Sequence, residues 1–346
     1  MRLEVDIEKR AGAFHLQTAF HCGGEWLGIL GPSGCGKSMT LKCIAGIERP
    51  DAGRIALNGR VLFDSEGHID LKPQQRRVGY LFQNYALFPG MTVRQNILCG
   101  LHAEKDRRRR ETRADEMLAL LQLEDVAGLR PGALSGGQAQ RAALGRILVN
   151  GPDLLMLDEP FSALDAHLRL RLQMELKKLL SDYCGGILMV THDRDEAFRM
   201  CDRLGVMAGG KMLAVKPTRV LFSDPETVAA AVLTGCKNIA EARRTGEHQV
   251  FVPGWNVTLT TEQPVGEGLK AVGVRAHHFS PEEPENRFPV DFAEELEEPF
   301  AWVSAFRYQG QAPESPALWW RYAKETRPQT PPKALGVPPK DILLLY

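Results

Sequence analysis

The sequence predicts an α/β domain followed by a smaller all-β domain, and three observations support this prediction. Short apolar runs at 26–30, 154–158 and 187–191 have the length and composition of buried strands in a parallel sheet. A helical segment separates the last two runs, as a parallel crossover requires. After about Gly235 the chain changes to short alternating segments separated by Pro and Gly, and four of the 5 tryptophans lie there. We therefore place the domains at 1–234 and 235–346.

Periodicity predicts the elements in order. Residues 1–30 carry strand signals, and a helix is expected from Lys37 onward. Its inward face would consist of Leu41, Ile44, Ala45 and Ile47. Residues 51–83 should hold short strands broken by a hairpin turn at Asn58-Gly59. A helical subdomain is expected at about 84–150, with an apolar stripe at Ala114, Met117, Leu118 and Leu121. Strands of the second domain are expected at 250–252, 257–259 and 301–306.

Composition excludes several classes of protein. The 346 residues carry a net charge of +0, which gives no reason to expect nucleic acid as a partner. The 7 cysteines are odd in number and form no C-x-x-C pair, which indicates reduced thiols in a cytosolic protein. The N-terminus has no apolar signal core, and no run approaches the roughly 20 apolar residues of a membrane span. A role at a membrane would therefore require docking on a separate membrane subunit.

A phosphate-binding loop is the clearest chemical motif. Gly31–Ser38 matches G-x-x-x-x-G-K-S/T in full, after an apolar strand and before a helix. Small residues let backbone N–H groups surround a triphosphate, Lys37 would neutralise its β and γ phosphates, and Ser38 would offer a hydroxyl to Mg²⁺. The nucleotide-binding residues expected are Gly31, Pro32, Ser33, Gly34, Cys35, Gly36, Lys37, Ser38 and Met39. Cys35 is predicted to have a lowered thiol pKa beside the helix N-terminus, or else to be an unreactive apolar filler.

Two acids and two polar side chains complete a predicted hydrolytic site. Asp158 ends an apolar strand, where it could reach Mg²⁺ through water, and Glu159 would orient and deprotonate the attacking water. Gln83 could ligate Mg²⁺, and His192 could hydrogen-bond the γ phosphate. The predicted catalytic residues are thus Glu159, His192 and Gln83, and the predicted magnesium ligands are Ser38, Gln83 and Asp158. The alternatives are a helix-capping acid pair, a surface glutamine and a structural histidine.

With these motifs in order, residues 1–234 resemble an ATP-binding-cassette (ABC) ATPase. The signature of that family matches Leu134-Ser135-Gly136-Gly137-Gln138. The resemblance implies an α/β P-loop NTPase cassette, with a mixed core sheet and a helical signature subdomain, which uses ATP and Mg²⁺. It also implies a head-to-tail homodimer in which Leu134, Ser135, Gly136, Gly137 and Gln138 contact the partner's ATP and Asp165 joins the two sites. Phe14 is the candidate for adenine stacking and Trp26 a weaker one; both could instead be core residues.

The β-rich extension resembles that of bacterial importers. The segments 234–239 and 273–278 are similar to the OB-like accessory barrel of ATPases that import molybdate, sulfate or ferric iron, and molybdate is favoured. This resemblance implies integral-membrane permease subunits, a periplasmic binding protein and a place on the cytoplasmic face of the membrane. The segment Gln83–Pro89 would then receive a helix of the membrane subunit, unless it packs internally.

Other functions stay open at this point. Sulfate, tungstate or ferric iron could be the cargo, and a non-transport ABC ATPase would need a second cassette or a coiled-coil insertion. The second domain could also be an oxyanion sensor built on Lys237 and Asn238, although support of the dimer is favoured. Residues 281–346 contain no motif that we can name.

Overall fold

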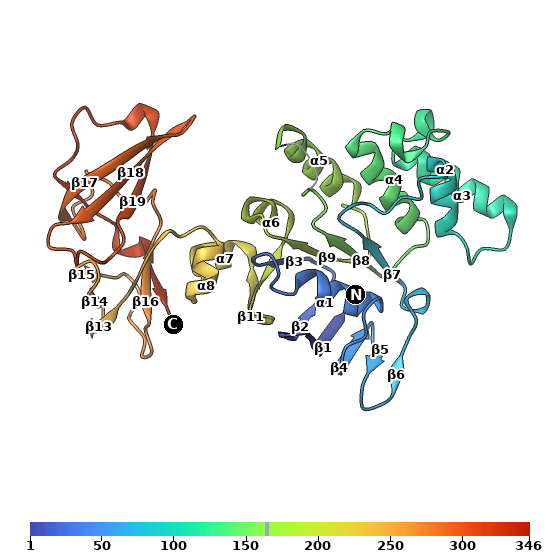
Figure 1. Ribbon diagram of the computed structural model, residues 1–346, viewed down its shortest axis with the longest axis horizontal. Helices are drawn as coiled ribbons and strands as arrows, with labels where there is room; N and C mark the ends of the chain where they lie inside the picture. The colour runs from blue at the N-terminus through green and yellow to red at the C-terminus, as the bar shows by residue number, and fades with distance from the viewer. Residues whose placement is uncertain (163–165) are drawn as a thin grey trace. The chain divides into compact units, whose positions relative to one another are not determined.

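The structure is a computed structural model that describes residues 1–162 and 166–346. The chain forms two compact units, Met1–Thr218 and Arg219–Tyr346 (Figure 1). The predicted class, an α/β domain followed by a β-rich domain, is confirmed. The boundary comes before the predicted 234/235, because the short helices α7 (Thr218–Ser223) and α8 (Val228–Leu233) are bonded to the second unit. The Arg275 guanidinium donates to the carbonyl oxygens of Phe222 and Thr234 there.

The first unit is built on one sheet. In the described part of the chain, this sheet has 11 strands in the order β6-β5-β4-β1-β2-β11-β10-β3-β9-β8-β7. The strands are β1 (Leu3–Ala11), β2 (Phe14–Cys22), β3 (Trp26–Leu30), β4 (Ala52–Leu57), β5 (Arg60–Asp64), β6 (Ile69–Asp70), β7 (Val78–Leu81), β8 (Leu154–Asp158), β9 (Gly186–Thr191), β10 (Arg203–Ala208) and β11 (Lys211–Pro217). Strands β10, β3, β9, β8 and β7 pair in parallel, so their carboxyl ends lie at one edge of the sheet.

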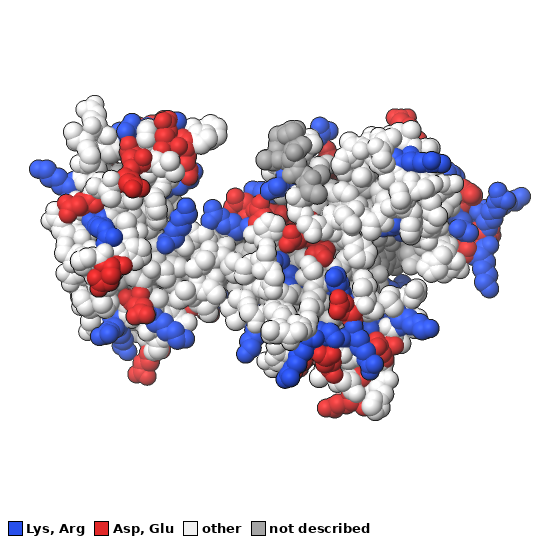
Figure 2. All heavy atoms as spheres, viewed as in Figure 1, with Lys and Arg blue, Asp and Glu red and all other residues white. Residues whose placement is uncertain are grey.

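Helices cover this sheet and form the predicted helical subdomain. The helices of the first unit are α1 (Lys37–Ala45), α2 (Val93–Gly100), α3 (Arg107–Leu120), α4 (Gly136–Leu148), α5 (Ala166–Leu179) and α6 (Arg194–Met200). The apolar stripe of α3 is buried at Ala114 and Leu118. The predicted inward face of α1 is correct except at Ile47, which is exposed because the helix ends at Gly46 in a left-handed conformation. Figure 2 shows basic side chains at the end of the subdomain where α3 lies, and Arg107–Arg109 are exposed there.

The hairpin predicted at Asn58-Gly59 joins β4 to β5. Both residues have positive φ angles, 53° and 79°, as a two-residue hairpin turn of this kind requires. This turn was therefore predictable from its two residues alone.

The second unit contains three small sheets, among the residues that the structure describes: β12-β16-β21, β13-β14-β15 and β19-β18-β17-β20. The strands are β12 (Asn238–Glu241), β13 (Arg243–Gly246), β14 (Gln249–Val252), β15 (Val257–Thr260), β16 (Ala271–Val274), β17 (Phe288–Glu297), β18 (Ala301–Tyr308), β19 (Leu318–Ala323), β20 (Ala334–Leu335) and β21 (Ile342–Leu345). Buried side chains of these strands and of the loops between them form a core that includes Trp255, Phe279, Phe306 and Trp320. In neither unit does a described helix have the length and apolar character to cross a membrane.

Candidate functional site

The predicted site residues follow the carboxyl ends of the parallel strands. The phosphate loop follows β3, Gln83 follows β7, Glu159 follows β8, and His192 follows β9. Because these strands are parallel neighbours, the four segments meet at one edge of the sheet, where open α/β sheets bind their ligands.

Lys37 is held at the centre of the phosphate loop. Its side chain is 4% exposed, and its Nζ donates to the carbonyl oxygens of Gly31 at 2.8 Å and Pro32 at 3.0 Å. Gly36 directly precedes helix α1; its φ of 107° favours glycine, and a Cβ at this position would meet the Phe14 ring at 3.1 Å. The first N–H groups of α1 have no partner within the helix, and the Lys37 ammonium belongs to the same turn, an arrangement that favours a bound anion.

Ser38 and Asp158 form a hydroxyl–carboxylate pair beside Lys37. The Ser38 Oγ donates to one Asp158 oxygen at 2.8 Å, and the Tyr80 hydroxyl donates to the other at 2.6 Å. Burial and this bond to Asp158 raise the pKa of Tyr80, so its hydroxyl stays protonated and orients the acid. The polar tip of Tyr80 in an otherwise apolar strand was the signal for this residue, which the sequence analysis missed.

The oxygens of Ser38 and Asp158 fit Mg²⁺, which prefers hard oxygen ligands. The third predicted ligand is placed differently. The Gln83 Nε2 donates to the Ser162 Oγ at 3.1 Å, and the Ser162 Oγ donates to the Glu159 carbonyl at 2.9 Å. Gln83 is therefore linked to the backbone of Glu159 rather than to Ser38 and Asp158. Asp165, the predicted link between two sites, lies outside the described residues.

Glu159 lies between two basic side chains. One carboxylate oxygen is 4.0 Å from the Lys37 Nζ, and the other is 3.1 Å from the His192 Nδ1. Its φ of 45° is unusual for a residue with a side chain, and its backbone N–H donates to the Val190 carbonyl at 3.0 Å. A strained backbone thus aims a carboxylate, 17% exposed, toward the mouth of the phosphate loop.

These groups border a cavity of about 290 Å³. Its lining residues are Phe14, Ser33, Gly34, Gly36, Lys37, Ser38, Met39, Lys42, Glu48 and Glu159. Phe14 thus borders the cavity, whereas Trp26 begins β3 at the end of the strand opposite the phosphate loop. Lys42 and Glu48, whose charged atoms are 3.9 Å apart, were missed because nothing in their spacing distinguishes them from surface charges.

Cys35 corrects one prediction. Its side chain is 4% exposed and packs into the core of the first unit, and burial raises the pKa of the thiol despite the nearby Lys37. The lowered pKa predicted from the helix N-terminus is therefore wrong, and the alternative of an unreactive apolar filler fits the structure.

The signature segment Leu134–Gln138 begins helix α4. The Ser135 Oγ accepts from the Gln138 N–H at 3.3 Å, while the Gln138 side chain accepts from the Ser135 N–H at 2.9 Å. Ser135 and Gly136 are exposed, and no residue of this segment lines the described cavity. One turn further on, the Gln140 Nε2 donates to the Pro160 carbonyl at 3.1 Å, which joins α4 to the residue after Glu159.

Asn238, which was predicted to help bind an anion in the second unit, instead connects strands. Asn238 is 3% exposed. Its Nδ2 donates to the carbonyl oxygens of Val274 at 3.0 Å and Trp319 at 2.9 Å, and its Oδ1 accepts from the Trp319 N–H at 2.6 Å. The Asn238 amide therefore connects strands and offers no N–H to an anion, which corrects the oxyanion-sensor alternative at this residue.

Comparisons with known proteins identify the family. The sequence profile described as "ABC transporter" matches residues 20–162. The "Spermidine/putrescine import ATP-binding protein PotA" of Bacillus cereus is 41% identical over 244 residues, which cover 70% of this chain and 72% of the relative. The chain belongs to the ABC transporter family. This cassette is also 39% identical over 223 residues to the "Molybdenum import ATP-binding protein ModC" of Paramagnetospirillum magneticum, with 64% of this chain and 61% of the relative covered.

The solved structures agree with this assignment. A dimeric ATP-binding cassette in a post-hydrolysis state, bound to ADP and Pi, is 28% identical to this ABC chain with a TM-score of 0.53. The match covers 63% of this chain and 99% of that structure. The chain spans only 60% of the length of another curated relative, the "Spermidine/putrescine import ATP-binding protein PotA" of Oleidesulfovibrio alaskensis. The similarity therefore rests mainly on the cassette.

Proposed function

We propose that this chain hydrolyses ATP with Mg²⁺ and thereby powers import through membrane permease subunits. The observation that carries the proposal is the position of Glu159, which lies at the mouth of a phosphate loop between Lys37 and His192. Family membership supports the importer class, because the similar curated proteins named above are import ATP-binding proteins.

Each residue has a distinct task in the proposed reaction. The loop amides and Lys37 hold the β and γ phosphates, and Phe14 stacks on the adenine. Ser38 and Asp158 would hold the Mg²⁺, which would neutralise phosphate charge. Glu159 accepts the proton of the attacking water, and His192 keeps the carboxylate aligned. Gln83 is bonded to Ser162, and through it a structural change at the site would reach the helical subdomain.

The complete site requires a second copy of the chain. The N-terminus of α4 is exposed at Ser135 and Gly136 and lies outside the cavity lining, so it is accessible to the ATP of another copy. The likeness to a dimeric cassette structure supports this arrangement. We place the dimer on the cytoplasmic face of the membrane, on permease subunits that a separate substrate-binding protein supplies.

Two classes of cargo are proposed for the importer. Molybdate follows from the sequence interpretation of the second unit and from the ModC relative. Polyamines follow from the PotA relative, of which the chain covers 72%. Uptake of labelled molybdate and spermidine by cells with and without this chain separates the two. If cells without this chain take up both compounds as well as cells with it, neither compound is the cargo.

Replacement of Glu159 tests the hydrolytic function. Glu159→Gln keeps the shape of the side chain but cannot accept a proton, so ATP turnover should fall by a factor on the order of 10² or more while ATP binding persists. The control is Glu116→Gln, an exposed acid on α3, which should hydrolyse ATP at the wild-type rate. Equal turnover in both variants would exclude Glu159 as the base.

A further inference from the structure

One face of the sheet β17-β18-β19 in the second unit is both aromatic and acidic. Residues directly opposite in the register share a face, so Glu295, Ser304 and Trp320 lie side by side. The next rung of the same face consists of Glu297, Trp302 and Tyr322. Figure 2 shows acidic side chains gathered over the part of this unit where β17 and β18 lie in Figure 1.

The segment Lys324–Pro332, which we call the strap, crosses this face. Lys324 pairs with Glu297 at 2.5 Å, and Arg327 pairs with Glu295 at 2.5 Å. The Arg327 guanidinium also lies over the Trp302 ring, 3.8 Å from its centroid. The Glu295 carboxylate and the Trp302 ring of this face therefore already bind an organic cation, the guanidinium of Arg327.

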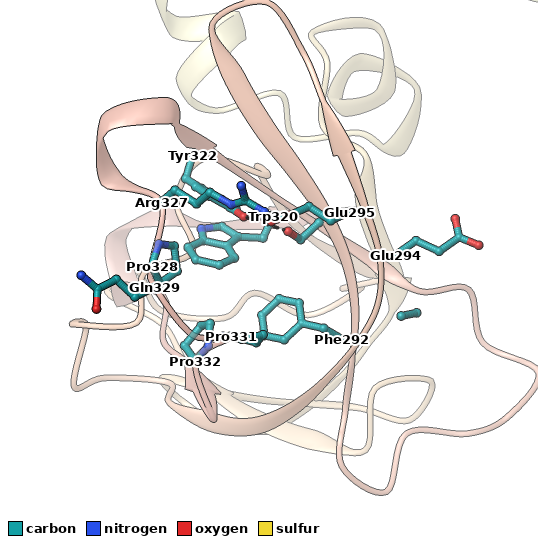
Figure 3. Close-up of a pocket in the computed structure, with 12 residues that line it drawn as sticks. Phe292, Glu294, Glu295, Trp320, Tyr322, Arg327, Pro328, Gln329, Pro331 and Pro332 are labelled. Atoms are coloured by element: carbon teal, nitrogen blue, oxygen red, sulfur yellow. Dashed lines mark hydrogen bonds and ion pairs between the residues drawn. The ribbon is translucent and has the colours of Figure 1, made fainter.

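A cavity of about 610 Å³ lies between the face and the strap. In Figure 3 the rings of Phe292 and Trp320 line one side and the strap prolines another, while the Glu294 carboxylate points away. Trp320 and Ser304 are each 3% exposed, so these walls are part of the folded core. The volume lies within the range of about 300–1,000 Å³ that small-molecule sites occupy.

The polar atoms that reach this cavity favour a cation. The Tyr322 hydroxyl donates to one Glu295 oxygen and is 3.2 Å from the Ser304 Oγ. The Trp320 Nε1 is already used, because it donates to the Phe279 carbonyl at 2.9 Å. Gln329 also borders the cavity, but its amide points outward in Figure 3. The inward-facing side-chain groups other than Arg327 are thus mainly oxygen acceptors and ring faces, both of which attract positive charge.

We propose that this cavity binds a small organic cation with a flat apolar group. The rings of Phe292 and Trp320 contact the apolar group, and Glu295 accepts hydrogen bonds from the cationic head. Arg327 competes for Glu295 from within the chain. The site lies wholly in the second unit and does not depend on ATP hydrolysis by the first, so its failure would leave the proposed function untouched.

Titration of the full chain with three ligands of one shape tests the charge requirement. Benzamidine is a cation, benzamide is its neutral analogue, and benzoate is the anion; calorimetry measures each, with molybdate as a further anion. Benzamidine should bind at least about tenfold more tightly than the other ligands, since a hydrogen bond to a charged group is worth more than a neutral one. Equal binding of benzamide, or tighter binding of benzoate or molybdate, would overturn the proposal.

Three variants test the residues. Glu295→Gln should weaken benzamidine binding about tenfold, whereas Glu298→Gln, an acid of the same hairpin paired with Arg321, should not change it. Arg327→Ala removes the internal competitor and should strengthen benzamidine binding. Unchanged binding in both Glu295→Gln and Arg327→Ala would locate benzamidine elsewhere and refute the assignment.

Discussion

Glu159 has a left-handed backbone, low exposure and two basic partners, Lys37 and His192. A carboxylate held in this way costs backbone strain, and such strain is often found where function needs a fixed geometry. The neighbouring Asp158 has both oxygens bonded, to Ser38 and to Tyr80. The two adjacent acids are therefore suited to different tasks, Asp158 to holding and Glu159 to accepting a proton.

Burial at Cys35 predicts low reactivity. Iodoacetamide at pH 8 should modify the exposed Cys184 of the native chain well before Cys35, because a buried thiol with a raised pKa forms little thiolate. Mass spectrometry of the labelled peptides measures both rates. Labelling of Cys35 as fast as Cys184 would show that the loop opens readily.

The buried carboxyl group of Glu196 should make the free energy of unfolding depend on pH. This acid is 3% exposed, accepts a hydrogen bond from the Thr191 hydroxyl at 3.2 Å, and burial raises its pKa to about 7. Because the folded pKa exceeds the unfolded one, the native state binds the proton more tightly between about pH 4.5 and 7. That stabilisation is present at low pH and is lost as the pH rises through 7.

The variant Glu196→Gln isolates this effect, since glutamine stays neutral. Relative to the wild type, it should gain roughly 2–3 kcal/mol in the free energy of unfolding between pH 5 and pH 8. Urea titrations at both pH values give the difference. Parallel pH curves for the two proteins would mean that Glu196 titrates normally.

Sequence spacing was sufficient to predict the position of some site residues but not the burial of others. Lys37, Ser38, Asp158 and Glu159 could be placed because a loop and a strand end fix where their backbones lie. The burial of a side chain depends on the packing of distant segments and could not be predicted from spacing. For this reason the prediction of a lowered thiol pKa at Cys35 was wrong.

At the scale of elements, the loop from Gln83 to Met91 is braced from two helices. The Asn96 side chain, 0% exposed on α2, accepts from the Phe88 N–H at 2.9 Å and donates to the Thr92 carbonyl at 3.0 Å. Arg146 on α4 donates to the Ala86 carbonyl at 2.7 Å. Phe88 itself is 47% exposed, so the bracing presents an apolar side chain at the surface where a membrane subunit is expected.

Removal of Asn96 should therefore destabilise this loop. Asn96→Ala leaves buried backbone groups without partners and should lower the free energy of unfolding by about 2 kcal/mol. Asn84→Ala, at an exposed position of the same loop, is the matched control. Equal urea midpoints for the two variants would mean that the bracing bonds contribute little.

Elements with a strong local signal were predictable. The Asn58-Gly59 hairpin and the apolar parallel strands follow from turn chemistry and composition. The start of the second unit was not predictable, because α7 and α8 are bonded to this unit through Arg275, which lies far from them in the sequence. The strap and its cavity have no local signature at all.

At the scale of the whole molecule, each unit has its own core, and the candidate site residues that the structure describes all belong to the first. The signature helix α4 is bonded to Pro160 through Gln140, yet its exposed N-terminus does not border the cavity of its own chain. Under the proposed function, a single chain therefore holds both halves of a site without joining them, and two copies would form two complete sites.

The variant Ser135→Arg tests this composite site most directly. A bulky cation at the start of α4 leaves the phosphate loop of its own chain intact but obstructs the ATP of a second copy. The control, Ser181→Arg, alters an exposed serine after α5. We expect ATP binding to match the wild type in both variants and ATP turnover to be lost only in Ser135→Arg. Wild-type turnover in Ser135→Arg would contradict hydrolysis between two chains.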